Sequence, residues 1–107
     1  MQDGKEISVT GVNHRSAPVS VREKCSLPED CLRRFLDSAR RGMGEALVLD
    51  TCNRTEFYCV SEPGGASMDY VLEHIREVGG PDLAGCADHF YRYVGTDAVS
   101  HLFRVAA

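Results

Sequence analysis

The sequence predicts one α+β domain built on a four-stranded antiparallel sheet. Two observations lead to this prediction. Segments with strand-like alternation and segments with helical periodicity follow one another in the order strand, helix, strand, strand, helix, strand, helix. The chain has 107 residues, which suffice for one domain with a modest core. The order matches a ferredoxin-like split βαβ plan, in which helices cover one face of the sheet.

The first strand and the first long helix are marked by different patterns. Residues 6 to 13 alternate apolar and polar side chains and include β-branched residues, as a half-buried strand does. A loop follows, and then a short helical stretch at 19 to 25. Ser26 and Glu29 have the spacing of a capping box, which predicts a helix that ends at Gly42. Its apolar positions recur at helical spacing: Cys31, Leu32, Phe35, Leu36 and Ala39.

Two strands are predicted in the middle of the chain. Residues 45 to 52 form an almost continuous apolar run, which is typical of a strand buried on both faces. Residues 55 to 60 are predicted as a third strand. The break between the two strands, at Asn53 and Arg54, makes them a hairpin if it is a turn.

The remaining segments complete the pattern. Apolar residues at helical spacing between Met68 and Val78 predict a second amphipathic helix, and residues 89 to 94 are a candidate fourth strand. Thr96 can cap a last helix that carries an apolar stripe. Because this helix reaches Ala107 without a stop signal, we expect the chain to be the front piece of a longer protein.

Composition and charge narrow the possible functions. Apolar residues make up 43% and charged residues 26%, as in soluble globular proteins. The formal net charge of -4 counts against a dedicated non-specific nucleic-acid binder. No apolar run approaches the ~20 residues of a membrane span, and the first residues lack a signal-peptide core, so we expect a cytoplasmic protein. The reducing environment of that compartment makes a disulfide framework of the five cysteines unexpected. The absence of a Cys-x-x-Cys pair counts against a zinc site.

Cys52 is the first candidate for chemistry. It is the last residue of the predicted second strand, at a position from which a side chain can reach a cleft. A thiolate is a nucleophile, and a guanidinium two residues away, at Arg54, can stabilise it or bind a substrate carboxylate with two hydrogen bonds. Cys52 also fits a small core position, because free cysteine is among the most buried residue types.

Two histidines are further candidates. His101 lies on the flank of the last helix, and Asp97, one turn earlier, can hold one of its ring nitrogens. His14 lies in the loop after the first strand, where site residues are often placed. Each also fits a solvated surface histidine. A stripe of arginines on the first long helix can meet phosphates or be a solvated face: Arg33, Arg34, Arg40 and Arg41.

Four motifs cover the chain nearly end to end, in order and at matching spacing. They are GVNHRSAP at 11 to 18, VREK at 21 to 24, TCNRTE at 51 to 56 and AVSHLFRVA at 98 to 106. Together they closely resemble the N-terminal catalytic domain of the glutamyl-tRNA reductase family. The TCNRTE block is the most specific of the four.

The resemblance implies a reaction and a set of site residues. The family reduces the glutamate carried on tRNA(Glu) to glutamate-1-semialdehyde with NADPH, the first committed step of tetrapyrrole (5-aminolevulinate and porphyrin) biosynthesis. By this resemblance Cys52 attacks the ester that joins glutamate to the tRNA and forms a thioester. His101 is a second catalytic residue. Thr51, Asn53 and Arg54 bind the substrate.

The resemblance also predicts what this chain lacks. Residues 1 to 107 correspond to the catalytic domain alone, without the NADPH-binding domain and the long helical dimerisation domain. We therefore expect no cofactor site, no metal and no reductase activity of the fragment, and a homodimer only for the intact enzyme. Asp50 departs from the family pattern, in which a small or hydroxylated residue is more common.

Two other function classes remain open at this point. A non-catalytic RNA-binding module could stack bases on His89, Tyr91 and Tyr93, which fall on one face of a strand, although no RNP1-like sequence accompanies them. A general cysteine hydrolase would need a second base and a glycine-rich oxyanion loop, and neither is evident in the sequence.

Overall fold

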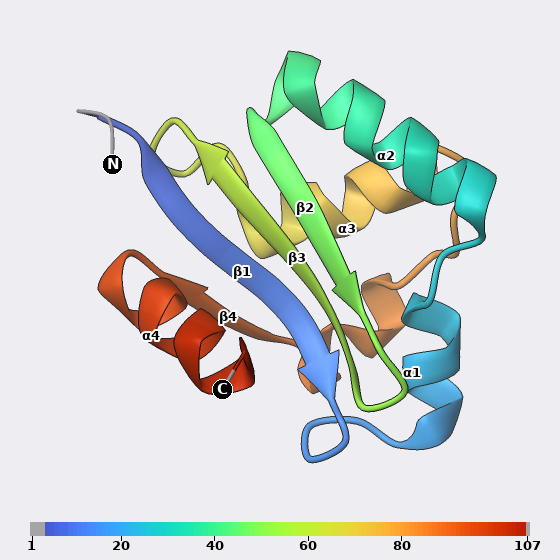
Figure 1. Ribbon diagram of the computed structural model, residues 1–107. Helices are drawn as coiled ribbons and strands as arrows, with labels where there is room; N and C mark the ends of the chain where they lie inside the picture. Colours follow the sequence, from blue (N-terminus) through green and yellow to red (C-terminus); the bar gives the residue numbers. More distant parts are fainter. Residues whose placement is uncertain (1–3, 107) are drawn as a thin grey trace.

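The computed structural model describes residues 4–106 and has the predicted antiparallel sheet (Figure 1). The strands lie in the order β2-β3-β1-β4, and each neighbouring pair is antiparallel. This is the order of a ferredoxin-like split βαβ sheet, so the predicted fold class is confirmed. The elements are β1 (Glu6–Asn13), α1 (Val19–Cys25), α2 (Glu29–Gly42), β2 (Glu45–Asp50), β3 (Arg54–Ser61), α3 (Met68–Glu77), the 3-10 helix η1 (Ala84–His89), β4 (Tyr91–Val94) and α4 (Thr96–Ala106).

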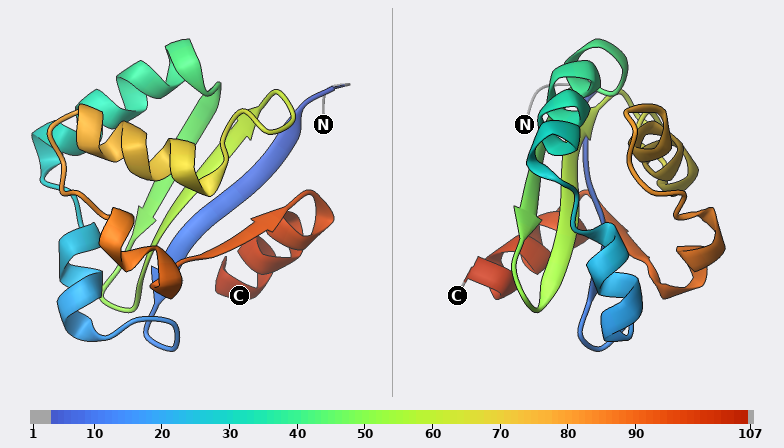
Figure 2. Two further views of the ribbon diagram at one scale, coloured as in Figure 1. Left: turned by 180° about the vertical axis from the view of Figure 1, so that it is seen from behind. Right: turned by 90° about the vertical axis from the view of Figure 1, so that its right-hand side faces the viewer.

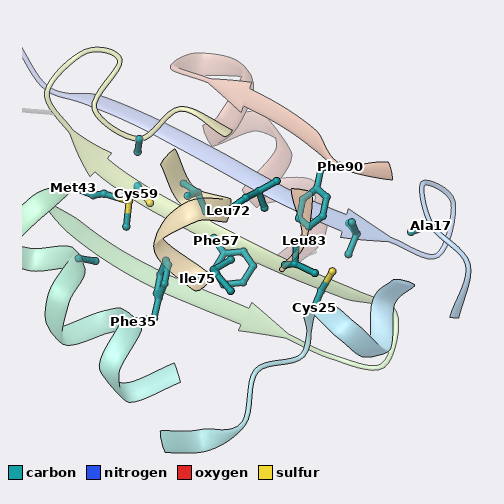
Figure 3. Close-up of a cluster of buried hydrophobic side chains, with 14 residues drawn as sticks. Ala17, Cys25, Phe35, Met43, Phe57, Cys59, Leu72, Ile75, Leu83 and Phe90 are labelled. Atoms are coloured by element: carbon teal, nitrogen blue, oxygen red, sulfur yellow. The ribbon is translucent and has the colours of Figure 1, made fainter. Parts of the chain in front are cut away.

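The helices α2 and α3 cover one face of the sheet and enclose the main core (Figures 2 and 3). Phe35 of α2, Phe57 of β3 and Ile75 of α3 are fully buried there. The rings of Phe35 and Phe57 meet edge to face, with centroids 5.3 Å apart. Apolar burial of this kind is the main contribution to the stability of the domain.

The last helix, α4, lies on the opposite face (Figure 2). Side chains alternate along a strand, so Val9 and Tyr58 point away from the main core, and Ala98 of α4 packs against them. The chain turns into α4 at Gly95, whose φ of +65° is readily adopted only by glycine among common residues. The expectation that all helices share one face is therefore wrong for α4, because the sheet carries apolar side chains on both faces.

The strand β2 is an edge strand and not, as its apolar run suggested, one buried on both faces. Leu47 at its centre is 53% exposed. The strands with buried residues on both faces are the two central ones, β1 from Ser8 to Val12 and β3 from Thr55 to Cys59. A short apolar run predicts a strand but not its place in the sheet, because strand order depends on contacts distant in sequence.

None of the helices between residues 4 and 106 combines the length and the apolar character that a membrane crossing requires.

Candidate active site

Cys52 and Asn53 form the two-residue loop of the β2–β3 hairpin. Backbone hydrogen bonds join Thr51 and Arg54 in both directions, at 2.8 and 3.3 Å. The backbone N–H of Asn53 donates to Thr51 Oγ1 at 3.2 Å. Neither loop residue has a positive φ, so the turn is not of the primed types that favour glycine. The loop leaves Cys52 exposed, so the alternative of a small core cysteine is wrong.

A pocket of about 210 Å³ lies beside Cys52. One side of the pocket is the hairpin, and the other is the helix α1 and the residue that follows it. Figure 1 shows the hairpin loop, α1 and the end of β1 at the same end of the molecule. The pocket is lined by Val19, Arg22, Glu23, Ser26, Asp50, Thr51, Cys52 and Thr55.

The cation in the Cys52 pocket is Arg22 and not Arg54. Arg22 Nη1 donates to the Ala17 carbonyl at 2.8 Å, and its Nε is buried with no partner among residues 4–106. The guanidinium of Arg54 instead bonds Glu56, with Nη1 3.3 Å from Oε2. Sequence reasoning missed Arg22 as a site residue, although it lies in the VREK motif.

Asp50 lines the same pocket with a second acidic residue, Glu23, and hydrogen bonds fix the Asp50 carboxylate. Its Oδ2 accepts a hydrogen bond from Ser26 Oγ at 2.7 Å, and its Oδ1 accepts one from Thr55 Oγ1 at 2.9 Å. Ser26 therefore does not form the predicted capping box, and α2 has no side-chain cap. The hydroxyl that was expected to start a helix instead joins α1 to the end of β2.

Glu56 is the centre of a buried polar cluster on the α4 side of the sheet. Its side chain is completely buried. Tyr58 donates to Oε1 at 2.8 Å, Tyr91 donates to Oε2 at 2.5 Å, and His101 Nε2 lies 2.5 Å from Oε2. Arg54 approaches the same oxygen at 3.3 Å. We call Glu56, Tyr58, Tyr91 and His101 the Glu56 cluster.

Hydrogen bonding keeps Glu56 ionised despite its burial. Desolvation by burial acts to raise the pKa of this carboxyl, but the hydrogen bonds from Tyr91, His101 and Tyr58 outweigh it, so the pKa is lowered from its ordinary value. Burial and the bonds to Glu56 raise the pKa values of Tyr58 and Tyr91. At neutral pH the carboxylate therefore accepts and both phenols donate.

Gly11 allows the Glu56 cluster to form across β1. In the sheet register Gly11 pairs with Glu56 on one side and with Tyr91 on the other. A Cβ at this position would lie 2.7 Å from the Thr55 carbonyl oxygen and 2.8 Å from Glu56 Cγ. Because Gly11 has no side chain, the carboxylate of β3 and the phenol of β4 can meet over the strand between them.

A second pocket, of about 350 Å³, adjoins the Glu56 cluster through His101 and Arg54. We call it the basic pocket, since five of its lining side chains are basic and none is acidic. Such a pocket favours an anion. It is lined by Asn13, His14, Arg15, Arg54, His101, Arg104 and Val105.

His101 is buried, at 7% exposed, and its ring packs against the rings of Tyr91 and Tyr93, which also contact each other. The ring centroids of these tyrosines lie 5.4 and 4.9 Å from that of His101. Its Nε2 is paired with Glu56, so the predicted pairing with Asp97 is replaced by one from the sheet. Glu56 was missed as a candidate, although alternation along β3 places Arg54, Glu56 and Tyr58 on one face.

The predicted site residues are divided between the two pockets. Thr51 and Cys52 line the Cys52 pocket, whereas Arg54 and His101 line the basic pocket with His14. Asn53, which is exposed, lies in the hairpin loop, between Cys52 and Arg54 in the sequence. Within residues 4–106 no group of three or more His, Cys, Asp or Glu side chains could hold a metal ion.

Comparisons with known proteins agree on one family. The model of the family described as "Glutamyl-tRNAGlu reductase, N-terminal domain" matches residues 10–107. A glutamyl-tRNA reductase of Desulforudis audaxviator is 41% identical over 104 residues, which cover 94% of this chain and 23% of that protein. One from Herpetosiphon aurantiacus is 39% identical, covering 95% of this chain and 24% of the relative.

A solved structure gives the same result. The structure titled glutamyl-tRNA reductase from Methanopyrus kandleri matches with a TM-score of 0.60 and 28% sequence identity, over 94% of this chain and 22% of that one. The chain thus spans about a quarter of the length of the relatives it matches. Sequence and fold together place this chain in the family of glutamyl-tRNA reductase N-terminal domains.

Proposed function

We propose that this chain forms the acyl-enzyme of a glutamyl-tRNA reductase, with Cys52 as the nucleophile. The Cys52 sulfur forms a bond to the carbonyl carbon of the glutamyl ester, the bond from that carbon to the tRNA 3′ oxygen breaks, and the oxygen takes up a proton. The observation that carries the proposal is the exposure of Cys52 beside a pocket that also holds Arg22. A cation that shares a pocket with an accessible thiol favours the thiolate, which is the nucleophilic form.

We assign the basic pocket to the anionic parts of the substrate. In glutamyl-tRNA the α-carboxyl group is esterified, so the side-chain carboxylate and the tRNA phosphates are the remaining negative charges. Arg54 can hold a carboxylate with two hydrogen bonds, and His101 lines the same pocket. Thr51 and Asn53 hold the glutamyl group from the hairpin loop.

The complete reaction needs more protein than this chain supplies. NADPH provides the hydride that converts a thioester to glutamate-1-semialdehyde, and we assign no residue between 4 and 106 to it. We further propose that the intact enzyme carries its cofactor and dimer contacts outside these residues.

The three side chains on which the RNA-binding alternative depends do not form a surface for base stacking. His89 belongs to η1 and not to β4, and its Nδ1 lies 3.2 Å from the Ser16 carbonyl oxygen. Tyr93 packs against the His101 ring, and Tyr91 is hydrogen-bonded to Glu56. Aromatic rings used in this way do not form the open platform that base stacking requires.

The test is covalent capture of the glutamyl group. The chain is mixed with tRNA that carries radiolabelled glutamate and is then precipitated in acid, which preserves a thioester. We expect label on the wild-type protein and none on Cys52→Ser. Cys86→Ser, which changes a partly buried cysteine elsewhere, should retain the label. Label that persists in Cys52→Ser would remove Cys52 from the mechanism.

A further inference from the structure

The function proposed above places His101 in the basic pocket but gives no role to Glu56. Glu56 is nevertheless the most completely bonded carboxylate between residues 4 and 106, since three members of the Glu56 cluster and Arg54 approach it. An ionised carboxylate has only acceptor atoms. Each neighbouring group must therefore direct a hydrogen toward Glu56.

This requirement fixes the proton of His101. Its Nε2 lies 2.5 Å from Glu56 Oε2, so Nε2 must carry a hydrogen. Nδ1 of the same ring has no hydrogen-bond partner among residues 4–106. Because His101 also lines the basic pocket, Nδ1 is the ring nitrogen left for a ligand there.

Tyr91 and Tyr58 hold Glu56 in the position that this pairing needs. Tyr91 donates to the same oxygen as His101, and Tyr58 donates to the other oxygen. Together they satisfy both carboxylate oxygens, so the side chain cannot turn away from His101 without leaving a buried donor unpaired. Tyr91 reaches Glu56 because Gly11 leaves space between them.

We propose that Glu56, held by Tyr91 and Tyr58, is a positioning residue that keeps a proton on His101 Nε2 and leaves Nδ1 as the nitrogen that meets the substrate. The proposal deepens the function above and rests on it for the identity of the substrate. In that reaction Nδ1, which carries no proton in the neutral ring, would take up the proton that the Cys52 thiol loses and pass it to the 3′ oxygen, while the Nε2 proton stays on the ring.

Nuclear magnetic resonance of the 107-residue chain with ¹⁵N-labelled histidine tests the proposal without substrate. We expect neutral His101 to show the pattern of an Nε2–H tautomer. His74, whose Nε2 lies 2.7 Å from Ser38 Oγ on the other side of the sheet, serves as an internal reference. A neutral His101 with its proton on Nδ1 would overturn the proposal, whatever the outcome of the Cys52 experiment.

Two matched variants test the role of Tyr91. Tyr91→Phe removes the hydroxyl that bonds Glu56, whereas Tyr93→Phe removes a hydroxyl on the other ring that packs against His101. Loss of a hydrogen bond to a charged group predicts about tenfold faster solvent exchange of the Nε2 proton in Tyr91→Phe. Tyr93→Phe should stay within about twofold of wild type. Equal exchange in the two variants would overturn the positioning role.

Discussion

The Cys52 pocket and the Glu56 cluster are two polar regions with opposite construction. Cys52 is exposed on a tight loop at an edge strand, whereas Glu56 is completely buried on the strand next to it. In the proposed function a large substrate has to reach the thiol, and Cys52 is accordingly exposed. The carboxylate acts on other side chains and never needs to meet solvent, so burial makes each of its hydrogen bonds stronger. The two regions should therefore respond differently to substitution.

The largest expected effect on stability is that of Glu56→Ala. It removes the acceptor of several buried donors, and breaking a buried charge pair costs about 3 to 5 kcal/mol of unfolding free energy. Urea unfolding followed by circular dichroism measures this loss. Glu62→Ala, at an exposed carboxylate paired with Lys5, is the matched control and should cost less than about 1 kcal/mol. Equal losses would mean that the Glu56 cluster adds no stability.

The buried position of Glu56 also predicts that the unfolding free energy depends on pH. The pKa of Glu56 is lowered in the folded state, so its contribution to stability is complete above the ordinary value of 4.5. That contribution is lost as the pH falls from this value through the folded pKa. Unfolding free energies of wild type and Glu56→Gln, measured between neutral and acid pH, should converge as the pH falls. A difference that stays constant would contradict the lowered pKa.

Gly11→Ala, on the neighbouring strand β1, should disturb the packing of the Glu56 cluster. The new methyl group would contact Glu56 Cγ and the Thr55 carbonyl, and overpacking of this kind costs about 1 to 3 kcal/mol. The expected result is a lower unfolding free energy together with a changed ¹⁵N signal of His101. Gly85→Ala is a control for overpacking, because nothing lies within 4 Å of a Cβ there and its φ is not positive. An unchanged His101 signal in folded Gly11→Ala would contradict the role of this glycine.

The sequence predicted local features more completely than distant contacts. The β2–β3 hairpin and the helices follow from periodicity and from residues close in sequence. The edge position of β2 and the side on which α4 lies depend on strand order, which local patterns do not encode. The partner of Arg54 was missed for another reason: Glu56 lies two residues away on the same face of β3, a signal that was available. The contact of Tyr91 with Glu56 had no such signal, because the two residues lie on different strands, with Gly11 of β1 between them.

The smallest expected effect concerns the charge of the Cys52 pocket. Asp50→Asn keeps a side chain of the same shape next to Ser26 and Thr55 but removes a negative charge from the pocket in which we propose that Cys52 reacts as a thiolate. At the effective dielectric near a protein surface this change corresponds to roughly a two- to fivefold faster capture of labelled glutamate. Salt should reduce the difference, since it screens charges at the surface.

The control for Asp50→Asn is Glu45→Gln, at the other end of the same edge strand. Glu45 is exposed and lines neither pocket, so the rate of capture should not change. Equal acceleration by both variants would assign the effect to the net charge of the chain and its attraction for tRNA. Acceleration by Asp50→Asn alone would assign it to the pocket, and slower capture would mean that Asp50 helps the reaction through its hydrogen bonds to Ser26 and Thr55.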